Sequence, residues 1–211
     1  MNNTIMQLSE AIIDGNIMEA KILTQKALDM GATAKQILDE GLMNGMNEVG
    51  ELFRDGELFV PEVLVASKAM DTGMEIIKPF LKEGDVEKKG KCVFATVKGD
   101  LHDIGKKLVA MMMEGAGYEI VDLGVDVSPE QLVDAVKEHE PELLGMSAML
   151  TTTMAYMNDT VKALEENGLL DKVGVMIGGA PVSPKYASEI NAKYSADASS
   201  AVELANSLIS L

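Results

Sequence analysis

His102 is the residue in this chain best suited to bind a metal, because of the stretch in which it stands, Asp100-Leu101-His102-Asp103-Ile104-Gly105. An apolar run over 91–97 precedes this stretch and predicts a buried strand, and the spacing of apolar residues over 104–114 predicts a helix after it. A histidine at the start of a helix lies near the positive end of the helix dipole, which favours the neutral imidazole that binds metals. His102 is therefore a candidate metal ligand.

Three neighbours of His102 would support that role. Asp100 can accept a hydrogen bond from the second ring nitrogen, which fixes the tautomer and makes the first nitrogen a stronger ligand. Asp103 is free to cap the helix, and Gly105 leaves room for a bulky group close to the backbone. The alternative is that both aspartates are only helix caps and that His102 is an ordinary surface residue.

Two further segments follow predicted strands and so belong at the same edge of a parallel sheet, where open α/β sheets bind their ligands. Residues 147–153, Ser-Ala-Met-Leu-Thr-Thr-Thr, include threonines that could bind a ligand or could simply cap the next helix. Gly178 and Gly179 lack Cβ atoms, so the backbone there can approach a ligand closely, although a pair of glycines is usually just a turn.

Strands and helices alternate through the C-terminal part of the chain. The apolar spacing predicts strands near 92–97, 118–123, 142–147, 173–177 and 193–195, and helices over 104–115, 129–139, 152–167, 183–191 and 198–209. This alternation predicts a parallel sheet of five strands with helices on both faces. The second histidine, His139, falls where a helix ends, and we interpret it as structural.

The N-terminal part predicts four amphipathic helices, over about 5–13, 17–28, 33–53 and 61–78. Short connections between such helices are typical of an antiparallel bundle. A charged segment flanked by glycines then lacks periodicity and reads as a linker. The predicted domains are a helical-bundle domain over 1–81, a linker over 82–90 and an α/β domain over 91–211.

Composition excludes several classes of function. The chain has 211 residues and a formal net charge of −16, which argues against nucleic acid as a partner. No apolar run approaches the length of a membrane span, and the first residues lack the basic start of a signal peptide. The single cysteine, Cys92, can form no internal disulfide, which fits a reducing cytoplasm.

Taken in order, these segments resemble the cobalamin-binding domain that holds its corrinoid base-off, with a histidine as the lower axial ligand. The family pattern Asp-x-His-x-x-Gly is matched by residues 100–105, Ser147-Ala148-Met149 stands where the family has Ser-x-Leu, and Gly178-Gly179 matches a Gly-Gly pair. The resemblance covers nearly the whole chain. It is greatest to the small corrinoid proteins of anaerobic methyltransferase systems, which serve methylamines, methanol, methoxyaromatics or betaines. Methionine synthase carries the same pair of domains within a longer chain.

The resemblance implies a four-helix bundle that caps the upper face of the corrin, followed by a flavodoxin-like (Rossmann-like) cobalamin-binding domain. His102 would bind cobalt, and Asp100 and Thr153 would complete a relay behind it, with threonine in place of the serine of methionine synthase. The residues that would contact the cofactor are Asp100, Leu101, His102, Asp103, Ile104, Gly105, Ser147, Met149, Thr151, Thr153, Gly178, Gly179 and Ala198, with Phe53, Val60 and Val63 in the cap.

Three departures from the family pattern stand beside these matches. Met149 replaces the usual leucine, Val60 is smaller than the usual capping leucine, and Asn191-Ala192-Lys193 replaces a glycine-rich turn. For the cap there is also a simpler interpretation, in which Phe53 and Phe59 belong to the core of the bundle.

The function that the resemblance implies is that of a methyl carrier. A substrate-specific methyltransferase would load a methyl group on cobalt, a second methyltransferase would pass it to a pterin or thiol, and a reductive activator would maintain the corrinoid. No residue of the chain is placed as a nucleophile, so we expect a carrier subunit rather than a complete enzyme. The alternatives are a cobalamin-dependent sensor or regulator, the small subunit of a radical mutase, and a flavodoxin-like domain that binds no corrinoid.

Overall fold

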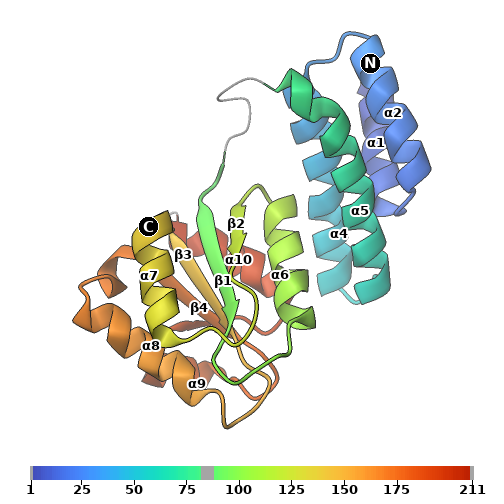
Figure 1. Ribbon diagram of the computed structural model, residues 1–211. Coiled ribbons are helices and arrows are strands. Elements are labelled where there is room, and N and C mark those ends of the chain that lie inside the picture. Colours follow the sequence, from blue (N-terminus) through green and yellow to red (C-terminus); the bar gives the residue numbers. More distant parts are fainter. Residues whose placement is uncertain (1, 82–87, 210–211) are drawn as a thin grey trace. The chain divides into compact units, whose positions relative to one another are not determined.

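The computed structural model describes residues 2–81 and 88–209, which divide into two compact units (Figure 1). One unit consists of helices from the N-terminal part of the chain, and the other contains a β-sheet with its flanking helices. Residues 82–87 of the predicted linker lie outside the described residues. The predicted boundaries of the two domains, 1–81 and 91–211, stay predictions.

The helical unit is built from four helical stretches, as the apolar spacing predicts. Its elements are α1 (Asn2–Ile13), α2 (Ile17–Asp29), α3 (Ala34–Gln36), η1 (Ile37–Met43), α4 (Asn44–Arg54), α5 (Val60–Ile77) and the short 3₁₀ helix η2 (Lys78–Phe80). Local capping sets two of the starts: the side chain of Asn16 accepts the backbone N–H of Glu19, and Thr33 and Gln36 form a reciprocal capping box. The core consists of fully buried side chains, among them Leu8, Ile12, Ile37, Leu38 and Leu42.

The third stretch differs from the single α-helix that the sequence predicts. It runs without a break through α3, η1 and α4, but η1 is a π-helix, with a wider turn than an α-helix. Two glycines in this stretch pack against α1: a Cβ on Gly41 would lie 2.9 Å from Leu8, and a Cβ on Gly45 would lie 2.8 Å from the backbone oxygen of Ser9. The irregular turn therefore belongs to a stretch that packs closely against α1, a feature that apolar spacing does not reveal.

The α/β unit contains the predicted five-stranded parallel sheet. Its strands are β1 (Lys91–Thr96), β2 (Glu119–Asp122), β3 (Leu143–Ser147), β4 (Gly174–Gly178) and β5 (Lys193–Tyr194), in the order β2-β1-β3-β4-β5. All neighbouring pairs are parallel, and the register places Thr96 opposite Ser147 and Ser147 opposite Gly178. The ends of β1, β3 and β4 therefore meet at one edge. The prediction of a bundle followed by a flavodoxin-like sheet is confirmed.

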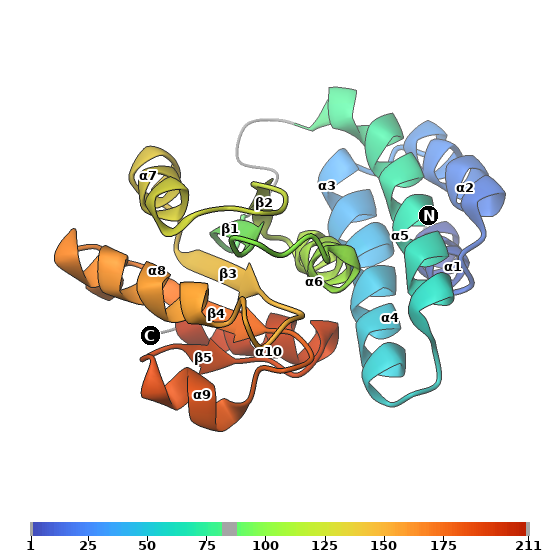
Figure 2. The same cartoon turned by 60° about the horizontal axis from the view of Figure 1, so that its bottom comes forward.

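Helices cover both faces of this sheet (Figure 2). They are α6 (Ile104–Gly115), α7 (Pro129–His139), α8 (Ala155–Glu166), the 3₁₀ helix η3 (Leu170–Lys172), α9 (Pro184–Glu189) and α10 (Ala198–Ile209). Apolar residues of α7, α8 and α9 form one core cluster with the strands, whereas α6 and α10 lie on the other face (Figure 1). Within the described ranges, no helix is long and apolar enough to cross a membrane.

One helix boundary at the candidate site differs from prediction. Helix α8 begins at Ala155 and not at residue 152, so the three threonines precede the helix instead of opening it. The reason is a turn in which the backbone N–H of Thr153 donates to the carbonyl of Leu150. This turn leaves Thr153 buried and facing the loop that carries His102.

Candidate functional site

The loop that carries His102 begins with a tight turn at the carboxyl end of β1. The backbone N–H of Val97 still bonds to the carbonyl of Ser147 on β3 (3.1 Å), and the N–H of Asp100 closes the turn on the carbonyl of Val97 (3.1 Å). Gly99 adopts a φ of 77° within this turn, a conformation that glycine accepts without steric cost. Asp103 then provides the carbonyl for the first bond of α6, to Lys107.

Asp100 is the most constrained side chain of the site. It is 0% exposed, and both carboxylate oxygens are fully used as acceptors. Oδ1 accepts from the ring Nδ1 of His102 at 2.7 Å and from its backbone N–H at 3.1 Å. Oδ2 accepts from the hydroxyl of Thr153 at 2.8 Å and from the backbone N–H groups of Met149 at 2.7 Å and Leu150 at 3.3 Å. The carboxylate thus connects the loops after β1 and β3.

These donors determine the charge of Asp100. Burial alone would raise the pKa of its carboxyl, but the hydrogen bonds from Met149, His102 and Thr153 outweigh burial and hold the pKa well below its usual range. An ionised carboxylate only accepts hydrogen bonds, so Nδ1 of His102 must carry the proton. The lone pair of the imidazole is then on Nε2, which is the nitrogen left to bind a metal.

A buried hydroxyl pair supports the backbone of the same loop. Thr96, at the end of β1, is fully buried and donates its hydroxyl to the carbonyl of His102 at 3.0 Å. Its oxygen also lies 3.0 Å from the hydroxyl of Ser147, which is therefore the donor in that pair. Sequence reasoning missed Thr96, and the available signal was a polar side chain inside an otherwise apolar strand. Ser147 was predicted to contact the cofactor, and that role stays a prediction.

The surroundings of His102 are apolar and open. Its side chain is 58% exposed, and the neighbouring Leu101 and Ile104 are 71% and 77% exposed. Met149 and Leu150, from the loop after β3, are further large apolar side chains left in water. A Cβ on Gly105 would meet no atom within 4 Å. One imidazole nitrogen surrounded by exposed apolar side chains fits a large, flat, mainly apolar group with a metal at its centre.

The other predicted residues of this unit are placed as follows. The carboxylate of Asp103 pairs with Lys107 at 2.5 Å, so its side chain is engaged in an ion pair beside the carbonyl that starts α6. Gly179 has a φ of 120°, and a Cβ there would lie 1.9 Å from the carbonyl oxygen of Ala148, so this glycine is required by the protein's own backbone. Thr151 is exposed and Ala198 is buried at the start of α10.

The three predicted cap residues all belong to the helical unit. Phe53 in α4 and Val60 at the start of α5 are half-buried, whereas Val63 is fully buried. Phe59 is 64% exposed, so the simpler interpretation, in which it belongs to the bundle core, is wrong for this residue. The role of Phe53, Val60 and Val63 over a corrin stays a prediction.

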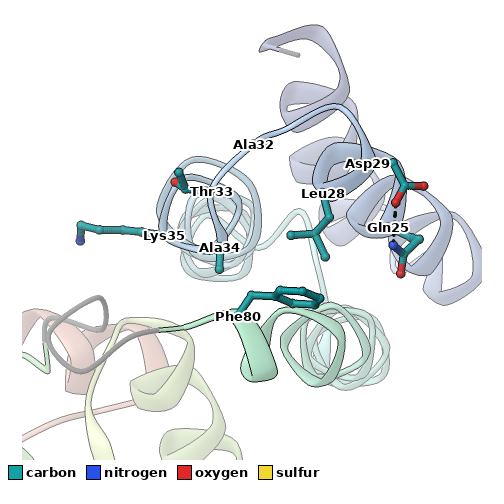
Figure 3. Close-up of a pocket in the computed structure, with 8 residues that line it drawn as sticks. All are labelled: Gln25, Leu28, Asp29, Ala32, Thr33, Ala34, Lys35 and Phe80. Atoms are coloured by element: carbon teal, nitrogen blue, oxygen red, sulfur yellow. Dashed lines mark hydrogen bonds between the residues drawn. The ribbon is translucent and has the colours of Figure 1, made fainter.

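In the described part of the chain, no three His, Cys, Asp or Glu side chains gather as a metal site, so the candidate metal ligand is a single imidazole. The helical unit has a pocket of about 630 Å³, drawn in Figure 3. Leu28 and Phe80 project into it, and Gln25 and Asp29 are hydrogen-bonded to each other at its rim (Figure 3). It includes none of the residues predicted from the sequence.

A flavodoxin-like sheet that presents one aspartate-held imidazole at its carboxyl edge defines a class, the cobalamin-binding proteins. Comparison of the chain with known protein families leads to the same class. Residues 90–203 match the B12 binding domain family, and residues 4–78 match a second family of the same description.

Relatives and solved structures extend this match to nearly the whole chain. Trimethylamine corrinoid protein 1 of Methanosarcina acetivorans is 41% identical over 190 residues, which cover 89% of this chain and 88% of the relative. The methanol:cobalamin methyltransferase complex MtaBC of Methanosarcina barkeri superposes with a TM-score of 0.90 at 32% identity, covering 99% of this chain and 80% of the matched one. A cobalamin-binding protein of Desulfitobacterium hafniense gives a TM-score of 0.80 at 33% identity, covering 97% and 98%.

This chain belongs to the family of corrinoid proteins of methyltransferase systems, and its cofactor is cobalamin. The predictions of family, fold and cofactor are thereby confirmed. The alternative of a flavodoxin-like domain that binds no corrinoid is wrong.

Proposed function

We propose that the chain is a methyl-carrier subunit that binds its corrinoid base-off, with Nε2 of His102 as the lower axial ligand of cobalt. The observation that carries the proposal is the hydrogen bond of 2.7 Å between Nδ1 of His102 and Asp100, made in a loop whose outer face is exposed and apolar. The bond directs the lone pair of the ring to Nε2. The bound corrinoid would supply the cobalt centre on which a methyl group is carried.

The residues of this chain would hold and tune that centre and would not act as nucleophiles. Asp100 keeps Nδ1 protonated, and its negative charge makes the imidazole a stronger donor through Nε2. Thr153 donates to the opposite oxygen of the same carboxylate and so fixes its orientation. Cys92 is a buried free thiol within β1, and burial raises its pKa to about 12, so it is neutral and unreactive in the folded protein.

Two methyltransferases are the proposed partners. One, specific for a methylated substrate, would load the carrier, and the other would transfer the methyl group to a pterin or a thiol. The similarity to a chain of the methanol:cobalamin methyltransferase complex supports the first, and the trimethylamine corrinoid relative indicates the class of substrate. A reductive activator of the corrinoid is the third proposed partner, and we propose the cytoplasm as the location.

The axial ligand is tested by the visible spectrum of the protein reconstituted with cobalamin. His102→Ala removes Nε2, so we expect loss of the base-off, His-on spectrum and a lower affinity for cobalamin. His139→Ala is the matched control, because it removes the other histidine and should leave spectrum and affinity unchanged. If the spectrum of His102→Ala equals that of the unmodified protein, His102 is not the ligand and this part of the proposal fails.

A further inference from the structure

Asp126 is an exposed residue in an unusual backbone conformation beside the His102 loop. It lies between β2 and α7, where Val127 forms an isolated bridge with Val97, and its φ is 57°. This left-handed region is uncommon for residues other than glycine, and aspartate and asparagine tolerate it best. Such a conformation at a ligand-binding edge calls for a reason.

Two hydrogen bonds of Asp126 give that reason. Its carboxylate Oδ1 accepts the backbone N–H of Gly99 at 2.7 Å, and its own backbone N–H donates to the carbonyl of Asp100 at 3.1 Å. The left-handed backbone lets one residue make both contacts, because it turns the N–H and the side chain toward the same loop. Asp126 therefore holds the turn on both sides of the peptide that joins Gly99 to Asp100.

The hydrogen bonds of Asp126 to the turn matter for Asp100, because the backbone and the side chain of Asp100 are held by different loops. Its side chain is held by donors from the loop after β3, whereas its backbone belongs to the turn after β1. A shift of the turn would move the ring of His102 relative to the carboxylate, because the carboxylate is also held by the loop after β3, and so would stretch the bond of 2.7 Å between them. By holding the turn in place, Asp126 therefore affects the orientation of the imidazole through Asp100.

We infer that Asp126 is a positioning residue that sets the tautomer and orientation of the His102 imidazole through the backbone of Asp100. The inference rests on the proposed function in that His102 is taken as the cobalt ligand. Its direct consequence can nevertheless be measured in protein without cobalamin, where failure of the inference and failure of the cobalt assignment give different results.

Two variants of Asp126 and one control separate the effect of its acceptor oxygen from the effect of its left-handed backbone. Asp126→Asn keeps an acceptor oxygen and tolerates the left-handed backbone, so it should behave as the unmodified protein. Asp126→Gly keeps the backbone conformation and removes the acceptor, so it isolates the bond to Gly99. Asn191→Ala is the control for backbone strain: Asn191 has a φ of 56° and precedes β5, at the opposite edge of the sheet from His102.

The first readout is ¹⁵N NMR of the His102 ring in protein without cobalamin, about two pH units above the usual imidazole pKa. We expect the form protonated at Nδ1 in the unmodified protein, in Asp126→Asn and in Asn191→Ala, and a shift toward the form protonated at Nε2 in Asp126→Gly. The second readout is cobalamin affinity, which should fall by about tenfold in Asp126→Gly only, the lower end of what outer-shell substitutions cost in metal affinity.

The inference is overturned if Asp126→Gly retains the ring shifts of the unmodified protein. It is also overturned if Asp126→Asn loses them as Asp126→Gly does, because the acceptor would then not be what matters, or if Asn191→Ala changes them, because general strain would then be the cause. An altered tautomer in Asp126→Gly with unchanged cobalamin affinity would support the positioning role and count against His102 as the cobalt ligand.

Discussion

At the scale of single residues, the site depends on one carboxylate. Asp100 receives donors from its own loop and from residues 49 to 53 positions away, so it orients the imidazole and joins two loops. Neutral side chains of the same shape cannot replace it, because every donor around Asp100 requires an acceptor. In asparagine one of the two acceptors becomes an NH₂ donor.

Asp100→Asn should therefore destabilise the protein even without cobalamin. The amide must face either Nδ1 of His102 or the N–H of Met149 with its NH₂ group, which leaves buried donors unpaired and costs about 1–3 kcal/mol of unfolding free energy. Cobalamin affinity should fall as well, because an amide facing Nδ1 favours the tautomer whose Nε2 is protonated and cannot bind a metal. Urea unfolding of the protein without cobalamin measures the first effect.

The role of the Asp100 carboxylate is checked by how the destabilisation in Asp100→Asn depends on pH. The folded-state pKa of Asp100 is depressed, so the stability from its carboxylate is present above the usual value of 3.8 and is lost as the pH falls below it. The difference in unfolding free energy between the unmodified protein and Asp100→Asn should accordingly shrink as the pH is lowered below about 4. A difference that stays constant over this range would contradict the role given to the carboxylate.

At the scale of secondary-structure elements, the helical unit depends on close contact between α1 and the third helical stretch. Gly45 faces α1 so closely that a Cβ would lie 2.7 Å from the Cβ of Ile12 and 2.8 Å from the carbonyl oxygen of Ser9. Neither atom can rotate away, because one is backbone and the other is attached directly to it. Any side chain at this position therefore pushes the two helices apart.

Gly45→Ala should destabilise the protein by about 1–3 kcal/mol, the usual cost of overpacking a core. The sign of this change in unfolding free energy is informative, because alanine at an ordinary helix position stabilises a protein relative to glycine by about 1 kcal/mol. Gly41→Ala is the matched comparison: the one atom that its Cβ would meet closer than 3.4 Å is a terminal methyl of Leu8, at 2.9 Å, which can rotate away, so it should cost less. Urea unfolding at neutral pH compares the two, and a stabilising Gly45→Ala would contradict the packing argument.

At the scale of the whole molecule, the described residues form two compact units, and His102, the residue proposed to bind cobalt, lies in the α/β unit. A ligand that binds the folded state alone stabilises it by mass action. The exposed apolar side chains around His102, including Leu101 and Ile104, would also leave water when the corrinoid binds.

Cobalamin should therefore raise the unfolding temperature of the protein. At a free concentration of about 100 times the dissociation constant, the added stability is about 2.7 kcal/mol, which corresponds to a shift of several degrees in scanning calorimetry. His102→Ala should reduce this shift at the same cobalamin concentration, and His139→Ala should retain it. An equal shift in both variants would show that the imidazole of His102 contributes nothing to binding.

Much of this protein is determined by local sequence. The order of strands and helices follows from apolar spacing, and the candidate ligand stands out because one histidine falls between a strand and a helix with an aspartate two residues before it. The pairing of Asp100 with His102 is predictable from the sequence as well, because side chains two residues apart on one loop are within hydrogen-bonding reach of each other.

Tertiary structure decided what joins that loop to the others. The register of β1 with β3 brings the hydroxyls of Thr96 and Ser147 together, and the turn before α8 aims Thr153 and the N–H of Met149 at Asp100. Asp126 reaches the same loop from beyond β2. The π-helix in the third stretch and the late start of α8 were likewise missed. Spacing along the chain predicts which face of an element a residue occupies, but hydrogen-bond partners depend on which strand ends the folded sheet places side by side.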